Sequence, residues 1–170
     1  VAPDGQILGV MYTQRVASYE TLLTAKRDTE LDLHSPTGPV IQLLGVVQRP
    51  DAKVGDLLRK HVLLLGRLDA TVERACGVTR CRAYESSSGK DYESHVAEGT
   101  DPGLLFHSAA GADIGELVAG YRPGDTANLG YGVMVCYEFR SRERARAVMA
   151  RDASPEGEQG TSLLPTSLSA

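Results

Sequence analysis

The sequence predicts a single domain of the mixed α/β (α+β) class, with a mixed sheet flanked by helices. Strand-like and helix-like segments alternate along most of the chain, and such alternation is typical of layered folds that combine a sheet with helices. With 170 residues, 42% of them hydrophobic, the chain is long enough for one core and too short for two. No internal repeat of roughly 20 to 50 residues is visible, so a repeat architecture is not expected.

The N-terminal third is expected to hold strands around one helix. Residues 6–16 are rich in β-branched and apolar side chains and follow a Pro-Asp-Gly turn at residues 3–5, which favours a hairpin. Ser18 can cap a helix that runs to about His34. Residues 40–50 are apolar on both faces, so they indicate a central strand of the sheet.

A helix and a further strand follow. In residues 54–69 apolar side chains recur at steps of three and four, as in an amphipathic helix with one buried stripe. Residues 72–84 read as a strand, and residues 85–101 as an irregular segment with one helical turn at 91–98. The expected buried stripe comprises Val54, Leu57, Leu58, His61, Val62, Leu65 and Leu68.

The last third repeats the alternation. Pro102 marks the start of a helix, residues 112–121 turn into a strand, and residues 121–130 form a loop by composition. Residues 132–140 are the final strand.

The C-terminal residues differ in composition from the rest. Residues 142–152 suggest a short basic helix, and residues 152–170 are poor in hydrophobic residues and rich in Pro, Ser, Gly and Glu. We therefore expect a domain over residues 1–151 and a flexible linker over 152–170, which hints that the natural polypeptide continues.

Charge and hydropathy argue against two classes of partner. The net charge is −4, and the 18 lysines and arginines are scattered rather than clustered, which disfavours nucleic acid. No apolar run approaches the roughly 20 residues that cross a bilayer, and no leader is recognisable. A cytoplasmic protein is expected.

The cysteines predict neither disulfides nor a metal site. Cys76, Cys81 and Cys136 are odd in number and lie in or near predicted strands, which fits reduced thiols. Neither CxxC nor HExxH spacing occurs among the cysteines and the four histidines.

The turn at residues 49–58 joins the central strand to a helix. This arrangement directs backbone N–H groups and the positive end of a helix at a phosphate, and Lys53, Val54 and Gly55 are the residues expected there. An ordinary strand-to-helix turn with a solvent-exposed lysine explains the same pattern equally well.

Three further residues are candidates for chemistry. Thr79 lies in a strand, His107 near the start of a helix and Arg122 in a Gly/Pro loop. Each residue also has an explanation that involves no chemistry. Thr79 would be a common strand residue, His107 a histidine whose hydrogen bonds are satisfied within the protein, and Arg122 a solvent-exposed loop arginine. A loop arginine can nevertheless clamp a carboxylate or phosphate.

Five segments together resemble the GNAT acyltransferase superfamily. More specifically, they resemble the GNAT-like domains in the loading modules of bacterial modular polyketide synthases, of the curacin type. The segments with Phe-His and with Tyr-Arg-Pro-x-Asp-x-x-Asn-Leu-Gly-Tyr-Gly-Val are the most specific. The five segments are residues 8–15, 41–50, 77–82, 101–114 and 120–133.

The resemblance implies a V-shaped mixed sheet that admits a phosphopantetheine arm. It implies decarboxylation of a malonyl- or methylmalonyl-type thioester on an acyl carrier protein, which makes the polyketide starter unit. His107 and Thr79 would be catalytic and Arg122 would bind substrate. No tightly bound cofactor is implied, since phosphopantetheine or CoA acts as the substrate carrier, and the partners would be the carrier protein and neighbouring synthase domains.

Two departures from the family pattern keep other functions open. The phosphate-binding turn retains a single glycine, Gly55, and the strand and helices that usually precede the hairpin are missing from this sequence. A CoA-dependent S- or N-acetyltransferase and a non-catalytic carrier-protein docking module are the alternatives.

Overall fold

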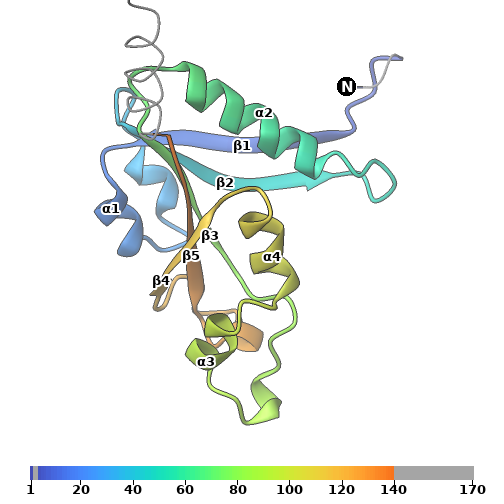
Figure 1. Ribbon diagram of the computed structural model, residues 1–170, viewed down its shortest axis with the longest axis vertical. Helices are drawn as coiled ribbons and strands as arrows, with labels where there is room; N and C mark the ends of the chain where they lie inside the picture. Colours follow the sequence, from blue (N-terminus) through green and yellow to red (C-terminus); the bar gives the residue numbers. More distant parts are fainter. Residues whose placement is uncertain (2–3, 140–170) are drawn as a thin grey trace, which may run out of the picture. The chain divides into compact units, whose positions relative to one another are not determined.

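Five strands form one sheet in the order β1-β2-β3-β5-β4 (Figure 1). The structure is a computed structural model, and it describes residue 1 and residues 4–139. Strands β2 and β3 run parallel, whereas the other neighbouring pairs are antiparallel. The predicted class, a mixed sheet flanked by helices, is confirmed.

Most elements lie close to where the sequence places them. The strands are β1 (Gly9–Val16), β2 (Val40–Gln48), β3 (Arg74–Thr79), β4 (Asp113–Val118) and β5 (Gly132–Glu138). The helices are α1 (Tyr19–Leu23), α2 (Gly55–Leu68), α3 (Tyr92–Ala97) and α4 (Pro102–Ser108). The basic helix expected at 142–152 and the linker expected at 152–170 lie outside the described residues.

The N-terminal expectations need two corrections. The single helix expected from Ser18 to His34 is two short pieces, α1 and a 3-10 turn at Glu30–Leu33. Ser18 does cap α1, because its hydroxyl accepts from the Thr21 amide at 3.3 Å. The hairpin expected at residues 3–5 is replaced by pairing of β1 with β2, since none of the described residues before β1 is in a strand.

The sheet buries side chains on both faces. Along β5, Met134 and Cys136 pack with Leu22 of α1, whereas Val135 and Tyr137 pack with Leu63 of α2. This alternation follows the two-residue period of a strand. Helices α1 and α2 therefore cover opposite faces of the sheet.

Helix α2 buries a different face from the predicted one. Its buried residues are Arg59, Leu63 and Gly66. A Cβ at Gly66 would lie 2.8 Å from both Ile41 and Phe139, so the glycine allows close approach to the sheet. Because the helix carries leucines on more than one side, periodicity alone selected the wrong stripe. The exposed members of the predicted stripe are Leu57, His61, Leu65 and Leu68.

Strands β2 and β3 separate after four residue pairs. Their pairing runs from Val40↔Arg74 to Leu43↔Gly77. Beyond that point β2 stays with β1 as far as Gln48, and β3 stays with β5 as far as Thr79. The sheet is therefore split into two diverging wings (Figure 1), which is the V shape that the family resemblance implies.

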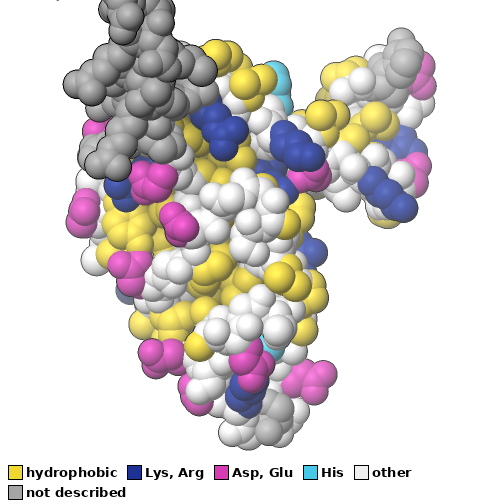
Figure 2. All heavy atoms as spheres, viewed as in Figure 1, with side chains coloured by type: hydrophobic (Ala, Val, Ile, Leu, Met, Phe, Trp, Pro, Cys, Tyr) yellow, Lys and Arg dark blue, Asp and Glu magenta, His cyan; other side chains and the backbone are white. Residues whose placement is uncertain are grey.

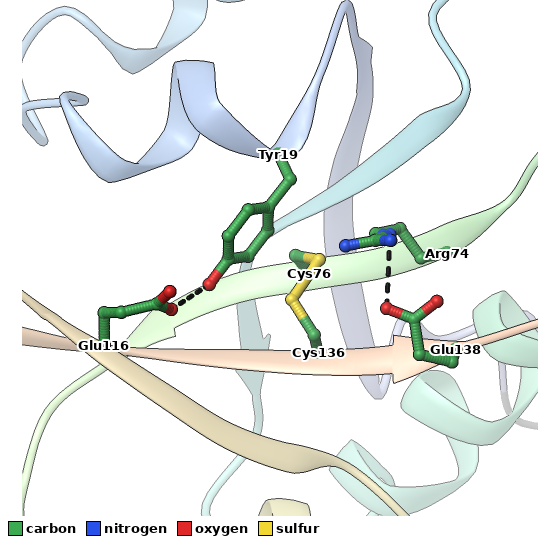
Figure 3. Close-up of a disulfide and its surroundings, with 6 residues drawn as sticks. All are labelled: Tyr19, Arg74, Cys76, Glu116, Cys136 and Glu138. Carbon is green, nitrogen blue, oxygen red and sulfur yellow. Dashed lines mark hydrogen bonds and ion pairs between the residues drawn. A yellow bond between two sulfur atoms is a disulfide. The ribbon is translucent and has the colours of Figure 1, made fainter.

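A disulfide joins β3 to β5. Cys76 and Cys136 are directly opposite in the antiparallel register, with Cα atoms 4.2 Å apart. Figure 3 shows the bridge beneath Tyr19, beside the Arg74–Glu138 ion pair of 3.2 Å. The prediction of reduced thiols is therefore wrong for these two residues, because strand register is not visible in cysteine spacing. Cys81 is free and buried.

The surface carries both signs of charge. On the face in Figure 2, acidic and basic side chains are interspersed with apolar ones. Within the described part of the chain, no helix has the length and apolarity needed to cross a membrane.

We expect the disulfide to stabilise the fold by about 4 kcal/mol, because it closes a loop of 60 residues in the unfolded chain. Urea unfolding of the wild type with and without dithiothreitol measures this difference. A Cys76→Ala/Cys136→Ala double variant should be insensitive to the reductant. Equal stability of the oxidised and reduced wild type would contradict the prediction.

Candidate functional site

A cavity of about 680 Å³ opens where β2 and β3 diverge. Residues 43–46 of β2 line one side, and residues 77–79 of β3 line the other. Helices α2 and α4 and the segments that follow β3 and β4 also contribute residues to the walls. The split in the sheet therefore creates the space in which a ligand can lie.

The cavity is positively charged. Arg59, Arg80, Arg82 and Arg122 line it, and among the described residues its lining contains no aspartate or glutamate. A cleft lined by charges of one sign attracts ligands of the opposite sign. The cavity is therefore suited to an anionic ligand.

Helix α4 places His107 on the cavity. Asp101 caps this helix by accepting from the Gly103 amide at 2.7 Å, and Pro102 occupies the first turn. His107 lies in the last turn, and its Nδ1 is 2.8 Å from the hydroxyl of Tyr137 on β5. The ring is thus held from the sheet side while its edge lines the cavity.

The carboxylate of Asp101 ties α4 to the segment that follows β3. It accepts from the backbone N–H groups of Arg82 and Ala83 at 3.1 and 2.8 Å, and it contacts His95 Nε2 at 3.2 Å. Asp101 is 1% exposed. Burial acts to raise its pKa, but the backbone donors outweigh burial and the pKa is lowered. This buried anion fixes the helix relative to β3.

Asp101 also belongs to a group of three potential metal ligands that lie close in space, although their spacing in the sequence does not indicate a metal site. Ligand atoms of Cys81, His95 and Asp101 all fall within 4.8 Å of one another. The Asp101 oxygens already accept backbone hydrogen bonds, and burial raises the pKa of the Cys81 thiol. In the described structure Asp101 is the member of this group that caps α4.

His107 is neutral at physiological pH. Burial lowers its pKa to about 4, and the charges of Arg59 and Arg82 act in the same direction. Burial raises the pKa of the Tyr137 hydroxyl, although the charge of Arg59 acts on it in the opposite direction. If that hydroxyl donates its proton to Nδ1 of His107, the ring accepts at this nitrogen. The imidazole then keeps its proton on Nε2, where it can be donated to a ligand.

Thr79 is the last residue of β3 and lies opposite Val133 of β5. Its side chain is half-buried and lines the same cavity as His107. A residue from the end of a strand and a residue from a helix therefore line one cavity, although 28 positions separate them in the sequence.

The loop after β4 presents Arg122. Its backbone N–H donates to the Gly130 carbonyl at 3.0 Å, which closes the loop. The neighbouring Tyr121 donates its hydroxyl proton to the buried carboxylate of Glu30 at 2.5 Å. Arg122 lines both this cavity and an adjacent, more open one of about 500 Å³.

The predicted phosphate turn contributes less than expected. Of Lys53, Val54 and Gly55, Gly55 is the residue that lines the cavity. Its amide already donates to the Gln48 side chain at 2.6 Å. Lys53 is exposed and has a φ of 47°, in the left-handed region that side chains seldom adopt.

Two residues of the site escaped the sequence analysis. Arg59 is a charged residue within the buried face of α2, and Tyr137 is a tyrosine in a strand that is buried apart from its last residue, Glu138. Buried tyrosine hydroxyls usually have a hydrogen-bond partner, which is the signal that could have singled out Tyr137. The identity of that partner depends on contacts between distant segments.

Solved structures resemble this chain closely. The GphF GNAT-like decarboxylase in complex with isobutyryl-CoA is 37% identical with a TM-score of 0.76, and the match covers 82% of this chain and 76% of that one. The loading GNATL domain of CurA from Lyngbya majuscula is 32% identical with a TM-score of 0.75, over 83% of this chain and 75% of that one.

A more distant structure shares the fold. Malonyl-CoA decarboxylase from Cupriavidus metallidurans is 12% identical with a TM-score of 0.52, and the match covers 84% of this chain and 51% of that one. At this identity the likeness concerns the fold alone. Comparisons with protein-family models and with curated proteins give no match.

We expect His107 to titrate near pH 4 in the folded protein. The unfolded chain takes up this proton near the ordinary value of about 6.5, so the unfolding free energy should fall as the pH drops from about 6.5 to 4. The full change is roughly 3 kcal/mol. Unfolding titrations across this pH range measure it, and a His107→Gln variant should lose this part of the slope. A His107 NMR titration midpoint near 6.5 would refute the prediction.

Proposed function

The chain belongs to the family of GNAT-like domains that includes the GphF decarboxylase and the CurA loading domain, and on this premise we propose that it is a thioester decarboxylase. The substrate would be a malonyl- or methylmalonyl-type thioester on an acyl carrier protein. The product would be the starter acyl group of a polyketide.

The observation that carries this proposal is that His107 and Thr79 both line one cationic cavity. Loss of carbon dioxide moves the negative charge of the carboxylate onto the thioester oxygen, as an enolate. Catalysis therefore requires hydrogen-bond donors placed where that charge develops. The Nε2–H of a neutral His107 and the hydroxyl of Thr79 are donors of this kind.

The step balances without an external reactant other than a proton. The bond between the α-carbon and the carboxylate breaks, and its electron pair forms the enolate while carbon dioxide leaves. A proton from solvent, relayed through a water molecule, then bonds to the α-carbon. The imidazole is neutral because its pKa is lowered to about 4, and it stabilises the oxyanion by donating a hydrogen bond without transferring its proton.

The rest of the cavity suits a long substrate arm. Beyond Leu43, β2 has parted from β3, so its inner edge can offer backbone groups to the amides of phosphopantetheine. Arg122 would bind the arm that carries the acyl group. The bond between Gln48 and Gly55 leaves fewer donors for a CoA pyrophosphate at the turn, which favours the carrier protein over free CoA. Such a loading domain would work in the cytoplasm beside its neighbouring synthase domains.

We expect His107→Ala to lower the decarboxylation rate about a hundredfold, because losing one oxyanion donor costs on the order of 3 kcal/mol of transition-state stabilisation. Thr79→Val should act in the same direction, whereas Thr79→Ser keeps the hydroxyl and should retain most of the activity. Intact-protein mass spectrometry of a malonyl-loaded carrier protein measures the loss of carbon dioxide.

The same assay separates the alternatives. An acetyl group moved from CoA to the carrier would indicate an acyltransferase, and an unchanged carrier mass would indicate a docking module. Full turnover by both His107→Ala and Thr79→Val would sink the proposed mechanism.

A further inference from the structure

Arg59 is a buried cation on the cavity wall. It lies in the second turn of α2, is 5% exposed and lines the cavity together with Thr79 and His107. Burial of an arginine is costly unless its charge and its donors find partners. The contacts of Arg59 therefore show whether groups of the protein itself compensate for the burial of its charge and its donors.

The protein provides hydrogen-bond partners for part of the Arg59 guanidinium group. One terminal nitrogen donates to the Phe106 carbonyl and the other to Asp56, and the group stacks 3.7 Å above the centre of the Phe106 ring. Among the described residues, Nε of Arg59 is the one buried side-chain nitrogen or oxygen atom that lacks a hydrogen-bond partner. The donor capacity of Arg59 is thus incompletely used.

The charge of Arg59 is also incompletely balanced. Asp56 is half-exposed and is shared with Lys60, whose Nζ lies 2.7 Å from its second oxygen. One half-exposed carboxylate therefore faces two cations. A net positive charge remains where Arg59 contacts the Phe106 carbonyl, next to His107, and an anionic ligand group would be stabilised there.

We propose that Arg59 binds the carboxylate that the substrate loses. This inference rests on the proposed decarboxylation, and it assigns to Arg59 a role distinct from the thioester-oxygen donors His107 and Thr79. Among the other arginines on the cavity, Arg80 is paired with Asp125 at 3.1 Å, and Arg122 extends to the second cavity. Arg59 and Arg82 are the arginines whose charges reach His107, and of these Arg59 is buried whereas Arg82 is exposed.

A cation at this place need not oppose the reaction. A tight ion pair with the carboxylate alone would stabilise the reactant and slow the loss of carbon dioxide. Here the same guanidinium acts on His107, so the enolate oxygen that His107 contacts lies within the field of Arg59 as well. The negative charge therefore stays near the same cation while it moves from the carboxylate to the enolate oxygen. Arg59 then contributes mainly to binding and orienting the substrate.

The test compares malonyl-CoA with acetyl-CoA, which differ by the carboxylate. Binding is measured by calorimetry in a His107→Ala background, where turnover is slow. We expect about tenfold tighter binding of malonyl-CoA, as for a charge-assisted contact. Adding Arg59→Met should reduce this preference to about twofold or less, with acetyl-CoA affinity changed by less than about threefold. Arg59→Lys, which keeps the charge, should retain part of the preference.

A matched control distinguishes a direct contact between Arg59 and the carboxylate from the overall positive potential of the cavity. Arg82→Met removes an exposed arginine from the same wall and should leave the malonyl preference intact. Equal loss of preference in Arg82→Met would overturn the assignment, as would equal weakening of both ligands in Arg59→Met or absence of any preference before Arg59 is changed.

Failure of the inference and failure of the proposed function give different results. If the domain prefers malonyl-CoA through Arg59 but releases no carbon dioxide, the binding role stands and the decarboxylase fails. If it releases carbon dioxide while Arg59→Met alters neither the malonyl preference nor the KM, the decarboxylase stands and the role of Arg59 fails.

Discussion

The separation of β2 from β3 is the constraint on which the site depends. Four residue pairs hold these two strands together, and then each follows its outer neighbour. Two neighbouring strands that diverge cannot bond to each other, so their backbone groups and side chains face a gap between the wings. The cavity occupies this gap, Thr79 lies where β3 ends beside it, and α2 and α4 supply Arg59 and His107 from the face that they cover.

The electrostatics of the site follow from burying an imidazole among arginines. Burial and two neighbouring positive charges both disfavour protonation of His107. A protonated histidine would add a further cation that the cavity does not balance. The neutral ring instead serves as a donor whose orientation is set by Tyr137, and the positive charge that attracts an anion is left to the arginines, which do not titrate near neutral pH.

The sequence predicts the elements better than the contacts between them. Strands, turns and the capping role of Ser18 follow from local chemistry, and the family resemblance brought Thr79, His107 and Arg122 to attention before any geometry was known. The face of α2 could not be predicted, since Gly66 rather than a leucine sets the closest approach to the sheet. The Cys76–Cys136 bridge and the bond between Tyr137 and His107 depend on pairings between distant segments, which no spacing rule encodes.

The buried carboxylate of Asp101 has a mechanical consequence. It joins the first turn of α4 to the backbone that leaves β3, so the two elements that carry His107 and Thr79 are tied to each other. The separation of the two donors is thereby set apart from the angle between the wings, which determines the space for an acyl chain. The wings thus determine which acyl chains fit, whereas the Asp101 link determines where the two donors lie relative to the reacting oxygen.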